Sequence, residues 1–292
     1  MNIDLLNDLY DNDIIYHYTN ASTAIDFILY NNQLKFNESR KSNDPIESSN
    51  PQRSTVYSIN QELSKEIMIN ANELDSFAYK LEKSFYQVCF CQNNMFEYYE
   101  NKNSINSFKG NEELFGFTKP RMWDQYADKY TGVCIAFSKE KILSKNKSLK
   151  LIEKNIEYLP FNELSLQKLG NFQGDYLIQV GKDVYEKKIN EIILKSFFLK
   201  HIDYSGENEY RIGTLYNKEK CAVEKIKDKF IFDSTIMLDI SKCIKSIFIS
   251  SYANNKQKKD LHKYSKKMNI PLIEIFWNHN SFEARDYKEY KL

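Results

Sequence analysis

The sequence predicts a single α+β domain over residues 1–292, in which helices flank a split or curved mixed β-sheet. Short apolar runs typical of strands alternate with longer amphipathic segments typical of helices along the whole chain. The 292 residues include only 8 glycines and 5 prolines, which leaves little sequence for flexible linkers between domains. Hydrophobic and charged residues, at 42% and 28%, stand in the proportions of a folded globular protein.

The strand-like segments differ in pattern. "FYQVCFC" (85–91) alternates between two faces, whereas "GVCIAF" (132–137) is apolar throughout, which is typical of a buried strand. The segments expected to form strands are 14–18, 33–36, 85–91, 132–137, 149–159, 207–216, 229–232, 236–240, 244–250 and 271–276.

Helical periodicity is clear in a second set of segments. Asn20 or Ser22 can cap the first helix, and Pro120 stands where a helix begins. The longest amphipathic pattern directs Ile189 and Ile193 toward the core. The segments expected to form helices are 20–31, 57–83, 120–130, 176–200 and 256–267. Polar residues 37–54 are expected to form a functional loop, and 93–118 an insertion or mobile loop.

Composition and charge narrow the function classes. The net charge of +1 gives no global signal for nucleic acid or membranes, and no apolar run is long enough to span a bilayer. Five cysteines at irregular spacing and an acidic N-terminus without a secretory pattern predict a cytoplasmic protein with reduced thiols. The 21 tyrosines and 19 phenylalanines supply rings that often line ligand pockets.

The first candidate site residue is His17, which ends an apolar strand just before a helix. A neutral imidazole there offers one donor and one acceptor, which suits a sugar hydroxyl; the alternative is a histidine satisfied within the fold. In "SNDPIE" (42–47), Asn43, Asp44 and Glu47 either bind a ligand or metal or stabilise a turn.

Two further motifs hold thiols and rings. Cys89 and Cys91 share one strand face, but no second Cys or His pair lies at the spacing of a structural zinc site, so buried thiols are expected. Trp123 and Tyr126 lie three residues apart on one helix face, where they either pack in the core or cover a nicotinamide or base.

The last motif, "GENEYR" (206–211), sets two carboxylates and a guanidinium close together. On a strand, Glu207, Glu209 and Arg211 would point to the same side. Close like charges raise one another's pKa, which catalysis can use, whereas Arg211 can instead neutralise both in a surface ladder.

These motifs in this order resemble a bacterial family, the domain-of-unknown-function family twenty-nine seventy-one, which is associated with phage defence. The resemblance is carried by "YHYT", "NDPIE", "CFC", "MWDQYA", "GVCIAF" and "ENEYR", and it covers about residues 14–276.

More remotely, the same series resembles the ADP-ribosyltransferase superfamily, which has a histidine after its first strand and a glutamate late on another strand. This resemblance implies an ADP-ribosyltransferase-like fold and NAD as a substrate. Catalytic roles fall to His17, Tyr126 and Glu209, with Glu209 opposing positive charge on the ribose during glycosidic bond cleavage. The NAD-contacting residues that it implies are His17, Tyr18, Thr19, Asn43, Trp123 and Arg211, and Glu207 would position the acceptor.

An enzyme of this kind would need NAD and a macromolecular acceptor, nucleic acid or protein, and as a toxin it would be paired with an antitoxin. The Lys-rich helix 256–267 either grips phosphates or is a solvated face. One alternative is a metal-assisted nuclease or hydrolase that uses His17, Asp44, Glu47, Glu207 and Glu209. Another is a non-catalytic sensor or interaction module that keeps the fold as a ligand pocket.

Overall fold

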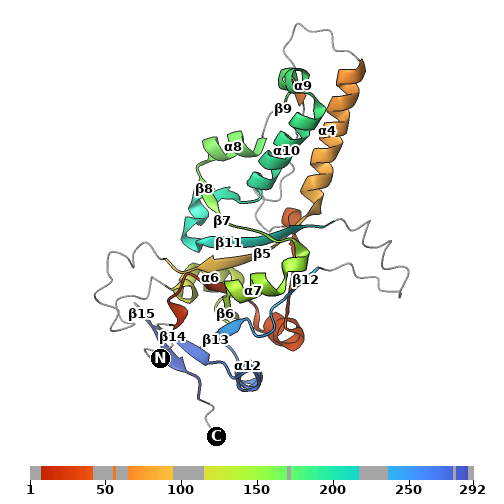
Figure 1. The fold of residues 1–292 in the computed structure, drawn as a ribbon. Coiled ribbons are helices and arrows are strands. Elements are labelled where there is room, and N and C mark those ends of the chain that lie inside the picture. The colour runs from red at the N-terminus through yellow and green to blue at the C-terminus, as the bar shows by residue number, and fades with distance from the viewer. Residues whose placement is uncertain are drawn as a thin grey trace.

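A mixed β-sheet runs through the molecule, with α7 and α12 against it and with α4, α8, α9 and α10 gathered beyond its β11–β7 end (Figure 1). The computed structural model describes residues 8–41, 55–56, 65–94, 115–169, 172–216, 236–278 and 281–288. In spatial order the strands of the sheet are β15 (Ser281–Asp286), β14 (Leu272–Asn278), β13 (Ile244–Ser250), β6 (Val133–Ser138), β1 (Ile14–Thr19), β5 (Phe85–Gln92), β11 (Glu209–Leu215) and β7 (Ile152–Asn155). Neighbours are antiparallel except β13 and β14, which are parallel. The expected α+β fold with a mixed sheet is therefore confirmed, and its organisation as one domain stays a prediction.

The sheet is nearly split between β1 and β5. β1 pairs with β6 at six positions, but it pairs with β5 only through Ile15–Gln92 and Tyr16–Cys91. Farther along β5, the short strand β3 (Asn37–Glu38) pairs opposite Gln87 and Tyr86. Val88–Phe90 lie between these two contacts, where no described strand pairs with that edge of β5.

Shorter strands and the helices complete the fold. The remaining strands are β2 (Gln33–Lys35), β4 (Thr55–Val56), β8 (Glu157–Leu159), β9 (Phe172–Gln173), β10 (Leu199–His201) and β12 (Met237–Asp239). The α-helices are α2 (Ala21–Thr23), α4 (Lys65–Ser84), α6 (Pro120–Tyr126), α7 (Lys139–Lys145), α8 (Phe161–Leu169), α9 (Gly174–Val180), α10 (Lys182–Ser196) and α12 (Asn255–Met268). A π-helical segment, η1 (Ala24–Leu29), continues α2, and 3₁₀ turns lie at η2 (Ser39–Lys41), η4 (Gly116–Thr118), η5 (Lys147–Leu149) and η6 (Ile202–Glu207). None of the described helices combines the length and apolar character that crossing a membrane requires.

Apolar side chains fill both faces of the sheet. Ile15 and Phe90 belong to the cluster under η1, α7 and α12, whereas Tyr16 and Cys91, one residue along, belong to the cluster under α6. A third cluster packs α4 and α10 against Phe85 at the far end of β5. The alternation follows from the two-residue period of a strand, and it fixes which side chains face each layer.

Several expectations for the elements are confirmed. Asn20 caps the first helix by accepting a hydrogen bond from the Thr23 N–H at 2.7 Å, and Pro120 is at the first turn of α6. The Lys-rich segment forms α12, in which the buried Lys258 pairs with Glu274 at 2.7 Å. The expected strand 229–232 lies outside the described residues.

Other expectations are wrong for identifiable reasons. The helix expected at 176–200 is broken at Gly181, whose φ of 78° is incompatible with a continuous helix, so α9 and α10 form instead and α4 is longer than either. The segment 149–159 forms two strands in different sheets, because β7 pairs with β11 whereas β8 pairs with β10. Phe115 and Phe117, at the end of the expected insertion or mobile loop 93–118, are core residues. Residues 95–114 lie outside the described part, so the expectation for them stays a prediction.

Gly213 is required by the packing of the third cluster. A Cβ at this position would lie 2.1 Å from the Phe85 ring, which stacks on Phe197 with centroids 4.1 Å apart. Gly213→Ala is therefore expected to lower the free energy of unfolding by about 1–3 kcal/mol, measured by urea denaturation. Gly206→Ala, where the added Cβ has no neighbour within 4 Å, is the control and should change it by less than about 0.5 kcal/mol. Equal effects of the two substitutions would contradict this account.

Candidate functional site

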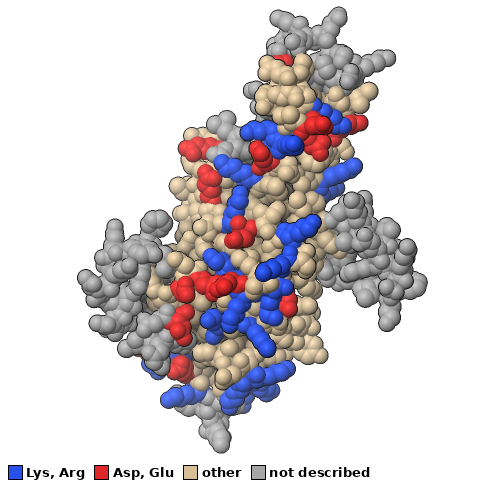
Figure 2. Space-filling model, viewed as in Figure 1, with Lys and Arg blue, Asp and Glu red and all other residues tan. Residues whose placement is uncertain are grey.

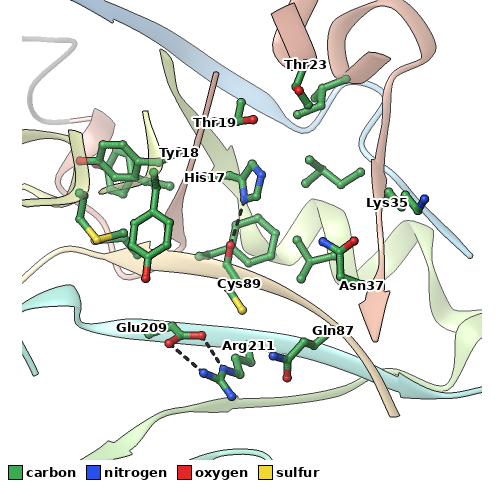
Figure 3. Close-up of a pocket in the computed structure, with 18 of the residues that line it drawn as sticks. His17, Tyr18, Thr19, Thr23, Lys35, Asn37, Gln87, Cys89, Glu209 and Arg211 are labelled. Atoms are coloured by element: carbon green, nitrogen blue, oxygen red, sulfur yellow. Dashed lines mark hydrogen bonds and ion pairs between the residues drawn. The ribbon is translucent and has the colours of Figure 1, made fainter. Parts of the chain in front are cut away.

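A cavity of about 670 Å³ occupies the opening between β1 and β5 (Figure 3). Its walls come from β1, η1, β2, β3, β5, α6, β10 and β11, which lie far apart along the chain. Of the residues singled out in the sequence, those that line the cavity are His17, Tyr18, Thr19, Cys89, Cys91, Tyr126, Glu207, Glu209 and Arg211. The expected meeting of an early histidine and a late glutamate at one hollow is thus present in the structure.

His17 is held by the main chain of β5. Its Nδ1 lies 3.0 Å from the Cys89 carbonyl oxygen, which only accepts, so Nδ1 carries the hydrogen (Figure 3). Burial lowers the pKa of His17 below 6.5, although the bond to Cys89 works in the opposite direction. The ring is therefore neutral at pH 7, and Nε2 is left as a hydrogen-bond acceptor.

His17 and Glu209 reach the cavity from opposite faces of the sheet. Pairing puts Tyr16 opposite Cys91 and Cys91 opposite Glu209, so these three share a face. His17 follows Tyr16 and points to the other face, where its ring lies 5.8 Å from that of Phe90. The two side chains line one cavity because the sheet is open beyond Tyr16.

Four buried charged residues form one ion-pair cluster at the cavity wall, which we call the charge cluster: Lys200, Glu207, Glu209 and Arg211. The Lys200 Nζ lies 2.7 Å from the Glu207 Oε2 and 3.1 Å from the Glu209 Oε2. Arg211 donates to Glu209 from Nε at 2.5 Å and from a terminal nitrogen at 3.0 Å, as the dashed lines in Figure 3 show. Two cations thus neutralise two carboxylates within the cluster.

The charge cluster keeps Glu209 ionised. Burial alone would raise the pKa of Glu209, but the Arg211 guanidinium and then the Lys200 ammonium lower it from 4.5 to about 2. A fixed, ionised carboxylate at a cavity wall can accept a ligand hydroxyl or oppose a positive charge that develops nearby.

Glu207 belongs to the charge cluster although it does not lie on the strand where it was expected. It ends η6 rather than lying on β11, because Asn208 adopts a left-handed φ of 46° and turns the chain before the strand starts at Glu209. The Asn208 side chain fixes this turn by donating to the Asn93 carbonyl oxygen at 2.8 Å. The expected single row of Glu207, Glu209 and Arg211 is therefore wrong for Glu207, although its carboxylate joins the other two.

Tyr126 connects the cluster to the cavity rim. The residue is 42% exposed, and its hydroxyl donates to the Glu207 Oε1 at 3.0 Å. Burial of the hydroxyl raises the pKa of Tyr126 well above 10, so the phenol stays protonated. The Tyr18 hydroxyl, by contrast, is already used, since it donates to the Gly116 carbonyl oxygen at 2.6 Å.

Trp123 is a core residue. Trp123 is 0% exposed, its indole N–H donates to the Phe117 carbonyl oxygen at 2.8 Å, and it does not line the cavity. Its expected contact with a nicotinamide is corrected to core packing. Asn43 lies outside the described residues, as do Asp44 and Glu47 of the nuclease alternative.

The two strand thiols also differ from each other. Cys91 is a buried thiol as expected, and burial raises its pKa to about 11. Cys89 is exposed and lines the cavity, contrary to the expectation that both are buried. Across the described residues there is no group of three or more His, Cys, Asp or Glu side chains arranged to hold a metal ion.

The sequence reasoning missed Lys200 and Gln87, both of which line the cavity. Lys200 follows the apolar run "FFL" (197–199), and a lysine in a buried strand needs a counterion, which is the signal that could have identified it. Gln87 lies on a strand that was expected, but an uncharged amide carries no such signal.

Residues 122–212 match the model of a family described as protein of unknown function (DUF2971). The match supports the family resemblance over that segment, which contains Tyr126 and the whole charge cluster but not His17. No curated protein and no solved structure matches the chain. The chemical roles of the cavity residues stay predictions.

The lowered pKa of Glu209 predicts an acid-dependent stability. A carboxyl group whose pKa is lower in the folded than in the unfolded chain stabilises the fold above about pH 5, and this contribution disappears as the pH falls through about 2. The difference in unfolding free energy between wild type and Glu209→Gln should therefore be on the order of 3 kcal/mol larger at pH 7 than at pH 2. Urea denaturation across this pH range measures it, and a constant difference would contradict the ion pairing.

Proposed function

We propose that the protein is an NAD-dependent ADP-ribosyltransferase-like enzyme whose active site is the cavity between β1 and β5. The observation that carries the proposal is the convergence of the His17 Nε2 acceptor and the ionised Glu209 on one cavity from distant parts of the chain. Its volume, about 670 Å³, falls in the range of ligand pockets and suits a dinucleotide.

The reaction needs a carboxylate where positive charge develops. The bond between the ribose C1′ and the nicotinamide nitrogen breaks, and nicotinamide leaves as a neutral molecule with the bonding electron pair. Glu209 accepts a hydrogen bond from the ribose 2′-hydroxyl and opposes the charge on the ring. The acceptor nucleophile then forms a bond to C1′ and releases a proton.

The surrounding residues hold the substrate in place. The His17 Nε2 accepts a hydrogen bond from a ribose hydroxyl, and Tyr126, at the rim, lies against the nicotinamide. Glu207, next to Tyr126, orients the acceptor nucleophile. Alignment of this kind is a large part of enzymatic rate enhancement.

Arg211 is better assigned as a positioning residue than as a pyrophosphate ligand. Besides its two hydrogen bonds to Glu209, the guanidinium donates to the Phe197 carbonyl oxygen at 2.7 Å. These bonds fix the side chain against β11 and orient the Glu209 carboxylate.

The acceptor is a macromolecule, nucleic acid or protein, as for a toxin or phage-defence effector held in check by an antitoxin. Lys and Arg side chains gather on the face that carries α7 and α12 (Figure 2). α12 contacts η1, which lines the cavity, so this basic helix lies next to an element of the cavity wall. Such a surface favours an acceptor rich in phosphates.

The test is release of nicotinamide from NAD by the purified protein with cell lysate or nucleic acid. Glu209→Gln should reduce the rate by about 10²- to 10³-fold, the effect of removing one stabilising group from a transition state. Glu274→Gln is a matched control, because it also removes the carboxylate of a buried ion pair but lies away from the cavity. It should leave the rate per folded protein unchanged.

The alternatives give different outcomes in the same experiment. A metal-assisted nuclease would degrade nucleic acid only with a divalent cation and would leave NAD intact. A non-catalytic sensor would bind ligand without turnover, and Glu209→Gln would preserve its cellular function. If neither the wild type nor any variant consumes NAD in the presence of lysate and nucleic acid, the proposed activity is wrong.

A further inference from the structure

Phe27 lies at the cavity rim with most of its ring in solvent. It lines the cavity together with Thr23 and Asn31, four residues before and four residues after it, yet its side chain is 64% exposed. Tyr30, at the end of η1, is 71% exposed. Large rings are usually buried, and π-helical segments such as η1 are rare and occur mostly at functional sites. Both observations indicate that η1 presents its rings to a partner.

α12, which packs beside η1, carries a stripe of lysines. Exposed lysines that lie three or four residues apart follow one face of this helix: Lys256, Lys259, Lys263 and Lys266. Neighbours in this lysine stripe are about 5 Å apart along the axis at roughly 1.5 Å per residue. The exposed Lys267 adds a further charge, and Asp260 is the only acidic residue of the helix. Lys side chains accordingly gather over α12 (Figure 2).

η1 lies between the lysine stripe and the cavity. It contacts α12 and also lines the cavity (Figure 1). Tyr264 marks the side of α12 that faces η1: burial raises the pKa of Tyr264, and the nearby Tyr30 and Asp26 raise it further. The exposed rings and the exposed lysines therefore stand on two neighbouring elements.

Rings beside a row of lysines are the features with which proteins bind single-stranded nucleic acid. Lysines contact the phosphates, and an exposed ring stacks on a base, whichever base it is. Stacking requires an unpaired base, because the bases of a duplex are stacked on one another and must be flipped out to be reached. A solvated helix face would explain the lysine stripe alone, but it would not explain a largely exposed phenylalanine at the rim of a cavity.

We propose that the protein binds single-stranded nucleic acid across α12 and η1, with phosphates on the lysine stripe and a base stacked on Phe27. The binding site follows from these residues and their positions. Its role as the acceptor site rests on the proposed function, and it places an unpaired base of the acceptor at the entrance to the cavity.

The test measures binding rather than turnover. Fluorescence anisotropy compares a labelled single strand of about 12 nucleotides, as DNA and as RNA, with a duplex of the same sequence. The wild type should bind at least one of the single strands about 10-fold or more tightly than the duplex, because only an unpaired base stacks on Phe27. Phe27→Ala should weaken single-strand binding by about 5- to 150-fold, whereas Phe27→Trp, which keeps a ring, should retain it.

Matched variants make the result specific. Phe161→Ala removes a ring that is 60% exposed on α8 and does not line the cavity, so it should leave the affinity unchanged. Lys259→Gln combined with Lys266→Gln should reduce the slope of log affinity against log salt by about 1.4, since each phosphate contact contributes about 0.7. Lys187→Gln combined with Lys188→Gln, at exposed positions of α10, removes the same charge and should leave the slope unchanged.

The outcomes separate this binding site from the activity itself. Single-strand binding that depends on Phe27 and the lysine stripe, without any nicotinamide release from NAD, supports the binding site and overturns the transferase. Nicotinamide release without nucleic-acid binding overturns the binding site alone and indicates a protein acceptor. Equal or tighter binding of the duplex, or single-strand affinity that survives Phe27→Ala, also overturns it.

Discussion

The cavity depends on the neutrality of the charge cluster. Glu207 and Glu209 are buried carboxylates, and an isolated buried charge would take up a proton or destabilise the fold. Between them, Lys200 and Arg211 lie within hydrogen-bond distance of both carboxylates. The cavity wall therefore carries four charged groups whose net charge is zero. Because each member has at least one partner within the set, the cluster acts as a unit, and loss of any one residue leaves an unmatched charge.

The open sheet places this cluster beside a ligand space. On one face of β5, Cys91 belongs to one apolar layer and Phe85 to another, while Cys89 and Gln87 lie between them and line the cavity. Next to Gln87, residues Val88–Phe90 of β5 lack a strand partner on the β1 side in the described structure, so the opening also admits His17 from the other face. The short pairing between β1 and β5 therefore explains both the opening in the sheet and the position of the cavity.

Much of the fold could be predicted because its signals are local. Apolar alternation identified β5, and a fully apolar run identified β6; Asn20 and Pro120 marked helix starts that the structure contains. The errors occurred where a single backbone angle decided the outcome, as at Gly181 and Asn208, whose positive φ values periodicity does not report.

The site was only partly predictable, for a related reason. His17 and Glu209 were identified through motif order, and no local pattern reveals that the sheet opens between them. Lys200 was missed because its role depends on two carboxylates that the chain reaches only seven and nine residues later, through a turn. Trp123 was misassigned because helical spacing alone does not say which face of α6 is covered by the core.

Because the His17 Nδ1 is bonded to the Cys89 carbonyl, acid would change the hydrogen-bonding role of the His17 Nε2 in the cavity. With Nδ1 committed to that carbonyl, an added proton enters at Nε2, and the nitrogen that accepted now donates. A ligand hydroxyl that donated to this atom would have to rotate and accept instead. Since burial lowers the pKa of His17, the inversion occurs in more acidic solution than for an exposed histidine.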